Sequence, residues 1–432
     1  MPTDAARGPE THKGFTMNFH HKLNLALLGV VCTGSSVAQV ELQPSSSPYY
    51  IGASQAFTRE DNIFRTPDGQ PEISDTYSTT SLLAGVNQPI GRQRLFANAA
   101  LSRNLFRDNS QLNNTAYDLD AGVDWATIEK LSGTLSYATR RNLARYGVDD
   151  GPTLTTERNE ERSQQLLARV QYGMASLLSL EGTAIHRKLD YSAASYAFKE
   201  LRQNSLGLRV LYRPSGLLTL GAGVRGTDGR YPSAIQSAPG VFEEDAFDRR
   251  DFDLSAVWAA TGLSRLTARL SYSKEDHDRL QSRDFSGVTG ALSWAYAATG
   301  KLNFITDLIR DTGSENSFNS FSSGASTSGN TNRISNAVRL RATYDATAKI
   351  RFGTDLKYQK RDLVNTFALT GGTSTQTGND KTTEFGLTGR YKPTRNAEIE
   401  CGVGREKRTT SSPISYAYSA GKASCQAQLI FQ

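Results

Sequence analysis

The chain has 432 residues and a mean hydropathy of −0.47. Apart from one short apolar stretch near its start, it lacks the runs of about 20 apolar residues that a helical transporter needs. Its 49 basic and 43 acidic side chains give a net charge of +6 but are mixed along the chain, which excludes a concentrated nucleic-acid-binding patch. Aromatic residues make up 9% of the chain and short apolar alternations recur to its last residue, so we expect a folded, mostly β protein.

The first residues predict an export signal. A short basic segment, Asn18–Lys22, precedes the apolar segment Leu23–Val31, and Ser36-Val37-Ala38 fits a small-x-small cleavage site. Cys32 follows two valines where a lipoprotein signal would have small residues, so cleavage after Ala38 is expected to remove it.

The position of this signal divides the chain into four predicted parts. We expect residues 1–16 to be a mis-assigned start and residues 17–38 to be the signal peptide. Residues 39–48 then form a short periplasmic lead, too short for a plug domain, and residues 49–432 form the folded unit.

From Tyr49 onward, apolar and polar residues alternate with period 2 in segments of about ten residues, the length of a tilted strand that crosses a bilayer. In one such segment Ile350, Phe352, Leu356 and Tyr358 alternate with polar residues and glycine. On a helix this pattern would scatter the charges around the axis, whereas on a strand it places them all on one face. The segments are therefore predicted to be strands.

The connections between these segments alternate strictly between short and long. The short turns are expected near Gly91–Gln93, Thr127–Leu131, Ala175–Leu178, Pro214–Gly216, Thr261–Leu263, Ala298–Gly300, Asp345–Thr347 and Pro393–Arg395. The long loops are expected near Arg59–Asp75, Asp108–Asn114, Asn142–Arg162, Ser192–Lys199, Pro232–Asp248, Asp276–Asp284, Asp311–Arg333, Leu363–Asp380 and Arg408–Ser415. Eight short turns and nine long loops predict eighteen antiparallel strands. Such alternation is typical of an all-β transmembrane barrel of the outer membrane, with both termini on the periplasmic side, and is not required of a soluble all-β protein.

Aromatic residues support this location. They are expected to form a periplasmic girdle at the headgroup level, because an amphipathic ring is stable there. Its predicted members are Trp125, Tyr172, Tyr212, Trp258, Tyr272, Trp294, Tyr296, Tyr344 and Tyr391. The final alternating segment, Cys425 to Phe431, resembles the terminal strand that the outer-membrane assembly machinery recognises, although Gln432 follows the aromatic. Outer-membrane lipid and that machinery are the predicted partners.

Candidate catalytic chemistry is scarce. The mature chain keeps only His186 and His277, far apart in sequence, each expected to be solvated near a loop. Hydrolase, nucleotide-binding and metal-ligand motifs are absent from the sequence, so we predict no enzyme, no catalytic residue, no metal and no cofactor. Cys401 and Cys425 are symmetric about Pro413 on the outward face, and either form a disulfide or remain two buried thiols.

Basic residues cluster on the face predicted to line the lumen. Arg339, Arg341, Arg351 and Lys357 lie on two neighbouring strands with only Asp355 nearby. Two hairpin registers would keep the faces matched, one placing Arg341 opposite Arg351 and the other placing Arg339 opposite Asp355. Arg265 and Arg269 share a further strand. Such a strip inside a channel favours an anionic solute, and these six residues are the predicted solute contacts.

Local sequence also suggests a family. Arg59-Glu60-Asp61-Asn62-Ile63-Phe64-Arg65, followed by Ser74-Asp75-Thr76-Tyr77-Ser78-Thr79-Thr80 and Ala84-Gly85-Val86, resembles the exopolysaccharide-locus outer-membrane proteins of EpsL type, a branch of the β-barrel porin families. The closing Ala423-Ser424-Cys425-Gln426-Ala427-Gln428 is similar as well. The resemblance implies a role in polysaccharide biosynthesis or export and brings no catalytic residues.

Three functions therefore remain open. A channel for an anionic polysaccharide or its fragments is the main expectation, with periplasmic export components as further partners and no nucleic acid. A non-conducting docking barrel of the secretion machinery, with outward loops such as Ser314–Asn332, and a general diffusion porin are the alternatives.

Overall fold

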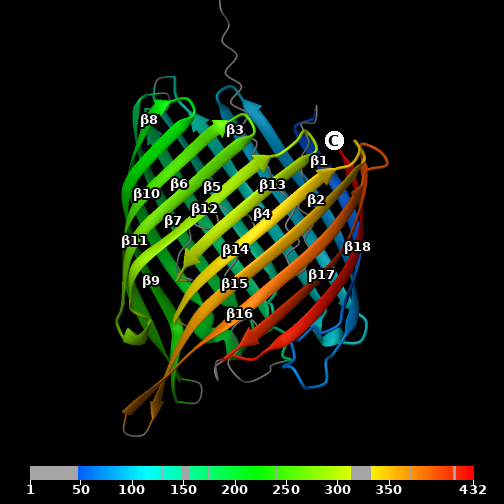
Figure 1. Cartoon of the computed structure of the whole chain (residues 1–432), viewed down its shortest axis with the longest axis vertical. Helices are drawn as coiled ribbons and strands as arrows, with labels where there is room; N and C mark the ends of the chain where they lie inside the picture. Colours follow the sequence, from blue (N-terminus) through cyan, green and yellow to red (C-terminus); the bar gives the residue numbers. More distant parts are fainter. Residues whose placement is uncertain are drawn as a thin grey trace, which may run out of the picture.

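The computed structural model describes residues 47–128, 130–147, 156–173, 176–238, 241–312, 332–369, 372–411 and 415–432. Within them the chain forms one closed antiparallel β-barrel of eighteen strands (Figure 1). No helix in these ranges is long and apolar enough to cross a membrane. The predicted extension, signal peptide, most of the periplasmic lead and nearly all of the loop Ser314–Asn332 lie outside the described residues.

The strands follow one another in sequence order around the ring. Their bounds are β1 Tyr49–Glu60, β2 Asp75–Ile90, β3 Gln93–Phe106, β4 Asn114–Ala126, β5 Leu131–Leu143, β6 Glu160–Tyr172, β7 Leu178–Tyr191, β8 Leu201–Ser215, β9 Leu218–Ala238, β10 Val241–Thr261, β11 Ser264–His277, β12 Phe285–Ala297, β13 Leu302–Asp311, β14 Asn332–Asp345, β15 Ile350–Leu369, β16 Gly372–Tyr391, β17 Ala397–Thr410 and β18 Tyr418–Phe431. Three short 3₁₀ segments, η1 Ser110–Leu112, η2 Ala194–Lys199 and η3 Gln281–Arg283, lie in connections at the long-loop end.

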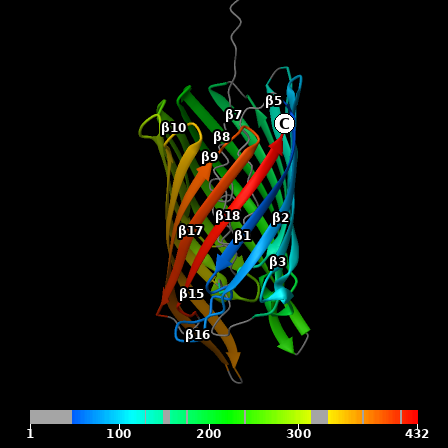
Figure 2. The same cartoon turned by 90° about the vertical axis from the view of Figure 1, so that its right-hand side faces the viewer.

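The first and last strands close the ring. β18 pairs with β1 from Ile51 opposite Phe431 to Glu60 opposite Lys422, and Figure 2 faces this seam. Closure leaves no unpaired edge, which is the condition for a β-sheet in a bilayer. The predicted fold, eighteen strands with both ends of the barrel chain at the short-turn end, is confirmed.

Two of the nine predicted long loops are wrong. Instead of loops over Pro232–Asp248 and Leu363–Asp380, β9 and β10 extend to Ala238 and Val241, and β15 and β16 extend to Leu369 and Gly372. The β15–β16 hairpin projects beyond the rest of the barrel in Figure 1. Outside the bilayer a strand needs no apolar face, so polar stretches such as Gly372 to Thr377 pair as strand although their composition suggests loop.

The outward face carries an apolar belt. Along β10, Phe252, Leu254 and Trp258 are 47–50% exposed, while the intervening Asp251 and Asp253 on the inner face are buried. Large apolar side chains exposed all around a closed barrel require lipid around them. The predicted girdle residues lie beside short turns, with one exception. The prediction for Tyr272 is wrong, because this residue lies toward the long-loop end of β11.

Candidate functional site: the lumen wall and its extracellular mouth

The inner wall consists of paired charges. Arg339 pairs with Asp355 at 2.6 Å, and Arg341 pairs with Asp307 on β13 at 2.7 Å. Both arginines are about nine-tenths buried.

The other two members of the predicted basic strip also have acidic partners. Arg351 pairs with Asp345 on β14 at 2.6 Å, and Lys357 pairs with Glu384 on β16 at 3.1 Å. The strip is therefore a ladder of alternating charge, because neighbouring strands supply one carboxylate for each cation.

Both registers predicted for the β14–β15 hairpin are wrong. The ladder places Arg339 opposite Lys357 and Arg341 opposite Asp355, which keeps the same faces but shifts the pairing by four residues from the first register and by two from the second. The cause is a longer turn, in which the Thr347 hydroxyl accepts hydrogen bonds from the backbone N–H groups of Lys349 and Ile350.

The remaining predicted residues lie apart from this ladder. Arg265 and Arg269 are on the inner face of β11, separated from β14 by β12 and β13, with Arg265 exposed and Arg269 buried. His186 is exposed on the outer face of β7 and its Nδ1 lies 2.7 Å from the Asn204 side-chain oxygen.

His277 does not have its predicted surroundings. It is 6% exposed, and its ring nitrogens contact Asp245 at 2.7 Å and Glu275 at 3.1 Å. The prediction of a solvated residue is wrong because β10 extends past the bilayer and brings Asp245 and Phe247 against it.

Across the extracellular mouth from His277, the loop after β1 folds into the barrel and is held there by hydrogen bonds. The Asn62 side-chain amide donates to the carbonyl of Ser419 on β18 at 3.0 Å, and the Asp68 N–H donates to the carbonyl of Ala417 at 2.9 Å. Ile63 and Phe64 pack with Leu112 in a buried cluster. The apolar pair in the middle of a polar loop thus explains why this loop folds back instead of extending into solvent.

Arg65 is the charged tip of this loop. Its side chain pairs with Glu60 at 2.5 Å and with Glu406 on β17 at 3.3 Å. With φ of 56°, it is the non-glycine residue with a left-handed backbone among those described. That conformation costs about 1–2 kcal/mol, and such strain is concentrated at functional sites.

A second loop meets the same carboxylates. Arg145, two residues after β5, pairs with Glu406 and with Glu384, the latter at 3.7 Å. Tyr146 packs edge-on against Phe64 with ring centroids 5.0 Å apart. We call Glu60, Arg65, Arg145, Glu384 and Glu406 the mouth bridge.

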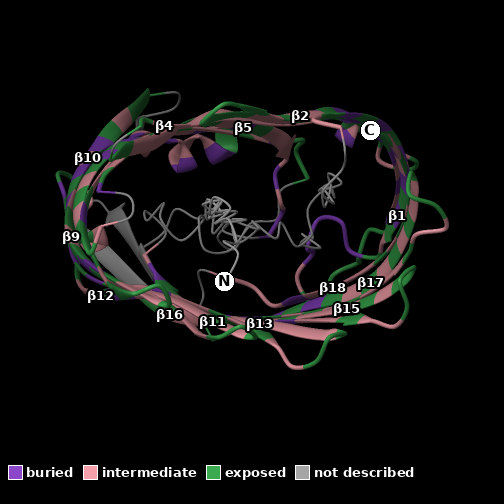
Figure 3. Ribbon diagram, turned by 90° about the horizontal axis from the view of Figure 1, so that it is seen from above, coloured by how far each residue is buried: buried purple, intermediate pink, exposed green. Residues whose placement is uncertain are grey.

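The mouth bridge crosses part of the lumen. Around the ring, β5 is separated from β17 by β4, β3, β2, β1 and β18. A contact between Arg145 and the wall at Glu406 must therefore follow a chord of the barrel rather than its circumference. Figure 3 shows non-strand segments inside the oval ring of strands, near β1, β2 and β18.

The electrostatics of the mouth bridge keep its arginines charged. Burial opposes the charge on each, but the attraction of Glu60 and Glu406 outweighs it and raises the pKa of Arg65. For Arg145, Glu406 and Glu384 outweigh burial in the same way and raise the pKa well above its ordinary value. Fixed charges of both signs therefore face one another across the mouth.

The two cysteines lie directly opposite each other on β17 and β18. Cys401 and Cys425 form a disulfide on the outward face, with Cα atoms 4.1 Å apart. Their pairing places the bond in the lipid-facing wall, away from the lumen.

Sequence reasoning missed Arg65, Arg145 and Glu406. For Glu406 a signal existed, since the alternation of β17 continues through Gly402 and Gly404 on the inner face. Arg145 had no comparable signal, because its partners lie on strands more than 200 positions away in the sequence.

No protein-family model matches the chain, and no curated protein matches it either. Among solved structures, it is similar to the outer-membrane protein OpdK of Pseudomonas aeruginosa, at 14% identity and a TM-score of 0.45, over 89% of this chain and 99% of that one. It is similar to OpdQ of the same organism at 12% identity and a TM-score of 0.45, over 89% and 98% of the two chains. The FrpB iron transporter of Neisseria meningitidis gives 8% identity and a TM-score of 0.45, over 90% and 82%. The closed ladder and the outward apolar belt themselves make this chain an outer-membrane β-barrel.

Proposed function

We propose that the chain is a passive diffusion channel for small hydrophilic solutes, narrowed at its extracellular mouth by the mouth bridge. The supporting observation is the chord that Arg145 makes to Glu384 and Glu406. Loops that fold inward onto a wall of paired charges leave a path whose cross-section and field select solutes. A purely structural barrel does not require charged side chains to meet across its lumen.

Single-channel recording of the refolded barrel in a planar bilayer tests this proposal. Wild type should conduct, and Arg145→Ala should raise the conductance because it removes the chord. Arg141→Ala is the matched control, since Arg141 lies on the same strand end and pairs with Glu160 on the adjacent strand. A barrel that never conducts would instead support the docking role.

The narrower hypothesis, export of an exopolysaccharide, rests on the resemblance of residues 59–65, 74–80, 84–86 and 423–428 to EpsL-type proteins. For that substrate the paired wall charges would contact sugar carboxylates and hydroxyls alternately. A clean deletion should then reduce secreted polymer while cytoplasmic sugar-nucleotide pools stay constant. Unchanged polymer would leave general diffusion as the function.

A further inference from the structure

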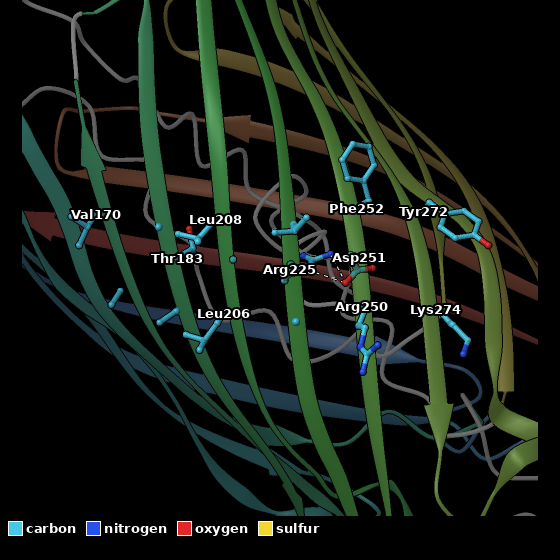
Figure 4. A pocket seen from close by; sticks show the side chains of 16 residues that line it. Val170, Thr183, Leu206, Leu208, Arg225, Arg250, Asp251, Phe252, Tyr272 and Lys274 are labelled. Atoms are coloured by element: carbon cyan, nitrogen blue, oxygen red, sulfur yellow. Dashed lines mark hydrogen bonds and ion pairs between the residues drawn. The ribbon is translucent and has the colours of Figure 1, made fainter.

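A shallow apolar groove lies on the lipid-facing side of the barrel between β6 and β11, with a volume of about 890 Å³ (Figure 4). Its floor consists of small residues, Gly182, Ala184 and Gly226. Leu206 and Leu208 on β8 stand beside them and are 70% and 60% exposed. A Cβ at Gly226 would meet nothing within 4 Å, so the floor is open toward the lipid.

Two cations stand where this groove ends on the extracellular side. The ladder places Gly226 opposite Arg250 and Arg250 opposite Lys274, all on the outward face. One step nearer the periplasm, Phe252 is opposite Tyr272, so the apolar belt stops where the charges begin. That boundary is the level of the lipid headgroups.

The cation pair is flanked on its extracellular side by the outward residues Asp228, Asp248 and Asp276, which the same ladders place opposite one another. Like charges directly opposite on neighbouring strands repel. Arg250 makes no ion pair with any residue in the described ranges. The Lys274 ammonium forms an ion pair with the exposed Asp276 carboxylate at 3.0 Å. A phosphate between the guanidinium and the ammonium would remove the repulsion and accept charge-assisted hydrogen bonds from both.

We propose that this surface binds a phosphorylated, multiply acylated lipid of the outer leaflet, of the chemistry of lipid A. Its phosphate lies between Arg250 and Lys274, and an acyl chain lies over Gly226 against Leu206 and Leu208. A second copy of the chain fits less well. A two-fold interface here would bring two copies of the same cation pair toward each other.

Native mass spectrometry of the full folded barrel, titrated with diphosphorylated lipid A, tests the proposal. Wild type should retain one lipid, and Arg250→Gln with Lys274→Gln should weaken binding about tenfold or more, as expected for the loss of charge-assisted bonds. The control is Lys360→Gln with Lys381→Gln, an outward pair of directly opposed cations that does not line the groove. This control should bind like wild type.

Two further arms separate charge from shape. Phosphate-free lipid A should bind wild type as weakly as the double variant binds the phosphorylated form. Gly226→Leu should fill the floor and reduce affinity with both cations intact, and the open space at Gly226 allows this variant to fold. Equal binding of the two lipids, or unchanged binding by the Arg250/Lys274 variant, overturns the proposal. So does a dimer that Gly226→Leu dissociates without changing lipid binding.

Discussion

Two groups of ion pairs at the extracellular end pack against buried aromatic residues, but the ion pairs of each group join very different parts of the chain. In the mouth bridge, Arg65 and Glu406 are 341 positions apart in the sequence. In the second group, which we call the histidine clamp, His277 and Asp245 are 32 positions apart, and Phe247 stacks on the histidine with centroids 5.2 Å apart.

This difference in separation indicates different roles. The histidine clamp forms within successive hairpins, so it can stabilise β10 and β11 before the ring is closed. The mouth bridge requires β1 and β18 to be paired already, because it joins the loop after β1 to β17. Of these two groups, the mouth bridge is the one that crosses part of the lumen.

Removing the central carboxylate of the mouth bridge should have the largest effect. Glu406 is 2% exposed and accepts from Arg65 at 3.3 Å and from the Tyr418 hydroxyl at 2.5 Å. Glu406→Gln leaves the buried Arg65 and the partly buried Arg145 undercompensated, and we expect a loss of about 3–5 kcal/mol in the free energy of unfolding. Denaturant unfolding in lipid vesicles measures it.

A matched control lies on the same strand. Glu398 pairs with Arg390 and Lys392 but is 23% exposed, so Glu398→Gln should cost less than about 1 kcal/mol after solvent screening. Equal losses in the two variants would show that the mouth bridge has no special energetic role.

The histidine clamp should depend on pH. It lies beyond Tyr272, the last outward aromatic of β11, and so outside the bilayer. Burial opposes protonation of His277, but hydrogen bonds from its ring to Asp245 and Glu275 outweigh burial and raise its pKa. Below the unfolded value of about 6.5 this stabilisation is complete, and it is lost as pH rises through the raised native pKa.

We therefore expect stability to fall as pH rises above about 6.5, by about 1.5–3 kcal/mol in all, the contribution of a hydrogen bond to a charged group. Asp245 does not add to this change, because its pKa is lowered and it stays ionised over the whole window. Thermal unfolding of wild type against His277→Gln measures the effect, and the variant should be flat with pH. If the stability of the wild type were equally independent of pH, the histidine clamp would not contribute to it as inferred.

Contact between the two loops of the mouth bridge can be tested at a glycine. Gly147 has φ of 71°, and a Cβ there would lie 2.5 Å from the Arg65 Cβ. Gly69 has φ of 86° and open space around it, so Gly69→Ala carries only the backbone cost of about 1 kcal/mol. Gly147→Ala should cost about 1 kcal/mol more than this control and also alter conductance. Equal losses of stability in Gly147→Ala and Gly69→Ala would show that the two loops move apart without cost and are not in tight contact.

Local patterns predicted the barrel and its strand number because period-2 alternation and connection length are readable within one hairpin. They failed where geometry depends on more distant or finer features. The β14–β15 register depends on a hydroxyl bond at Thr347, and the long hairpin at Ala238 and Val241 continues through polar sequence. The bridge between Arg145 and Glu406 depends on ring closure, which no local pattern encodes.

The smallest expected effect concerns ion selectivity in the wall below the mouth bridge. Arg351 and Lys357 remain 31% and 18% exposed at the side chain, whereas Arg341 and Asp307 form a buried pair whose disruption would confound a conductance measurement. Replacing Arg351 and Lys357 by Gln removes the ion-pair partner of Asp345 and leaves Glu384 with the more distant Arg145, at 3.7 Å. The channel should then favour cations, by a permeability ratio changed about fivefold or less, since a wet charge contributes about 1 kcal/mol. The reverse variant, Asp345→Asn, should shift the reversal potential in a salt gradient toward anions, and both shifts should shrink at high salt. If both variants conduct with wild-type selectivity, these ladder residues only hold the strands together and solute does not pass this wall.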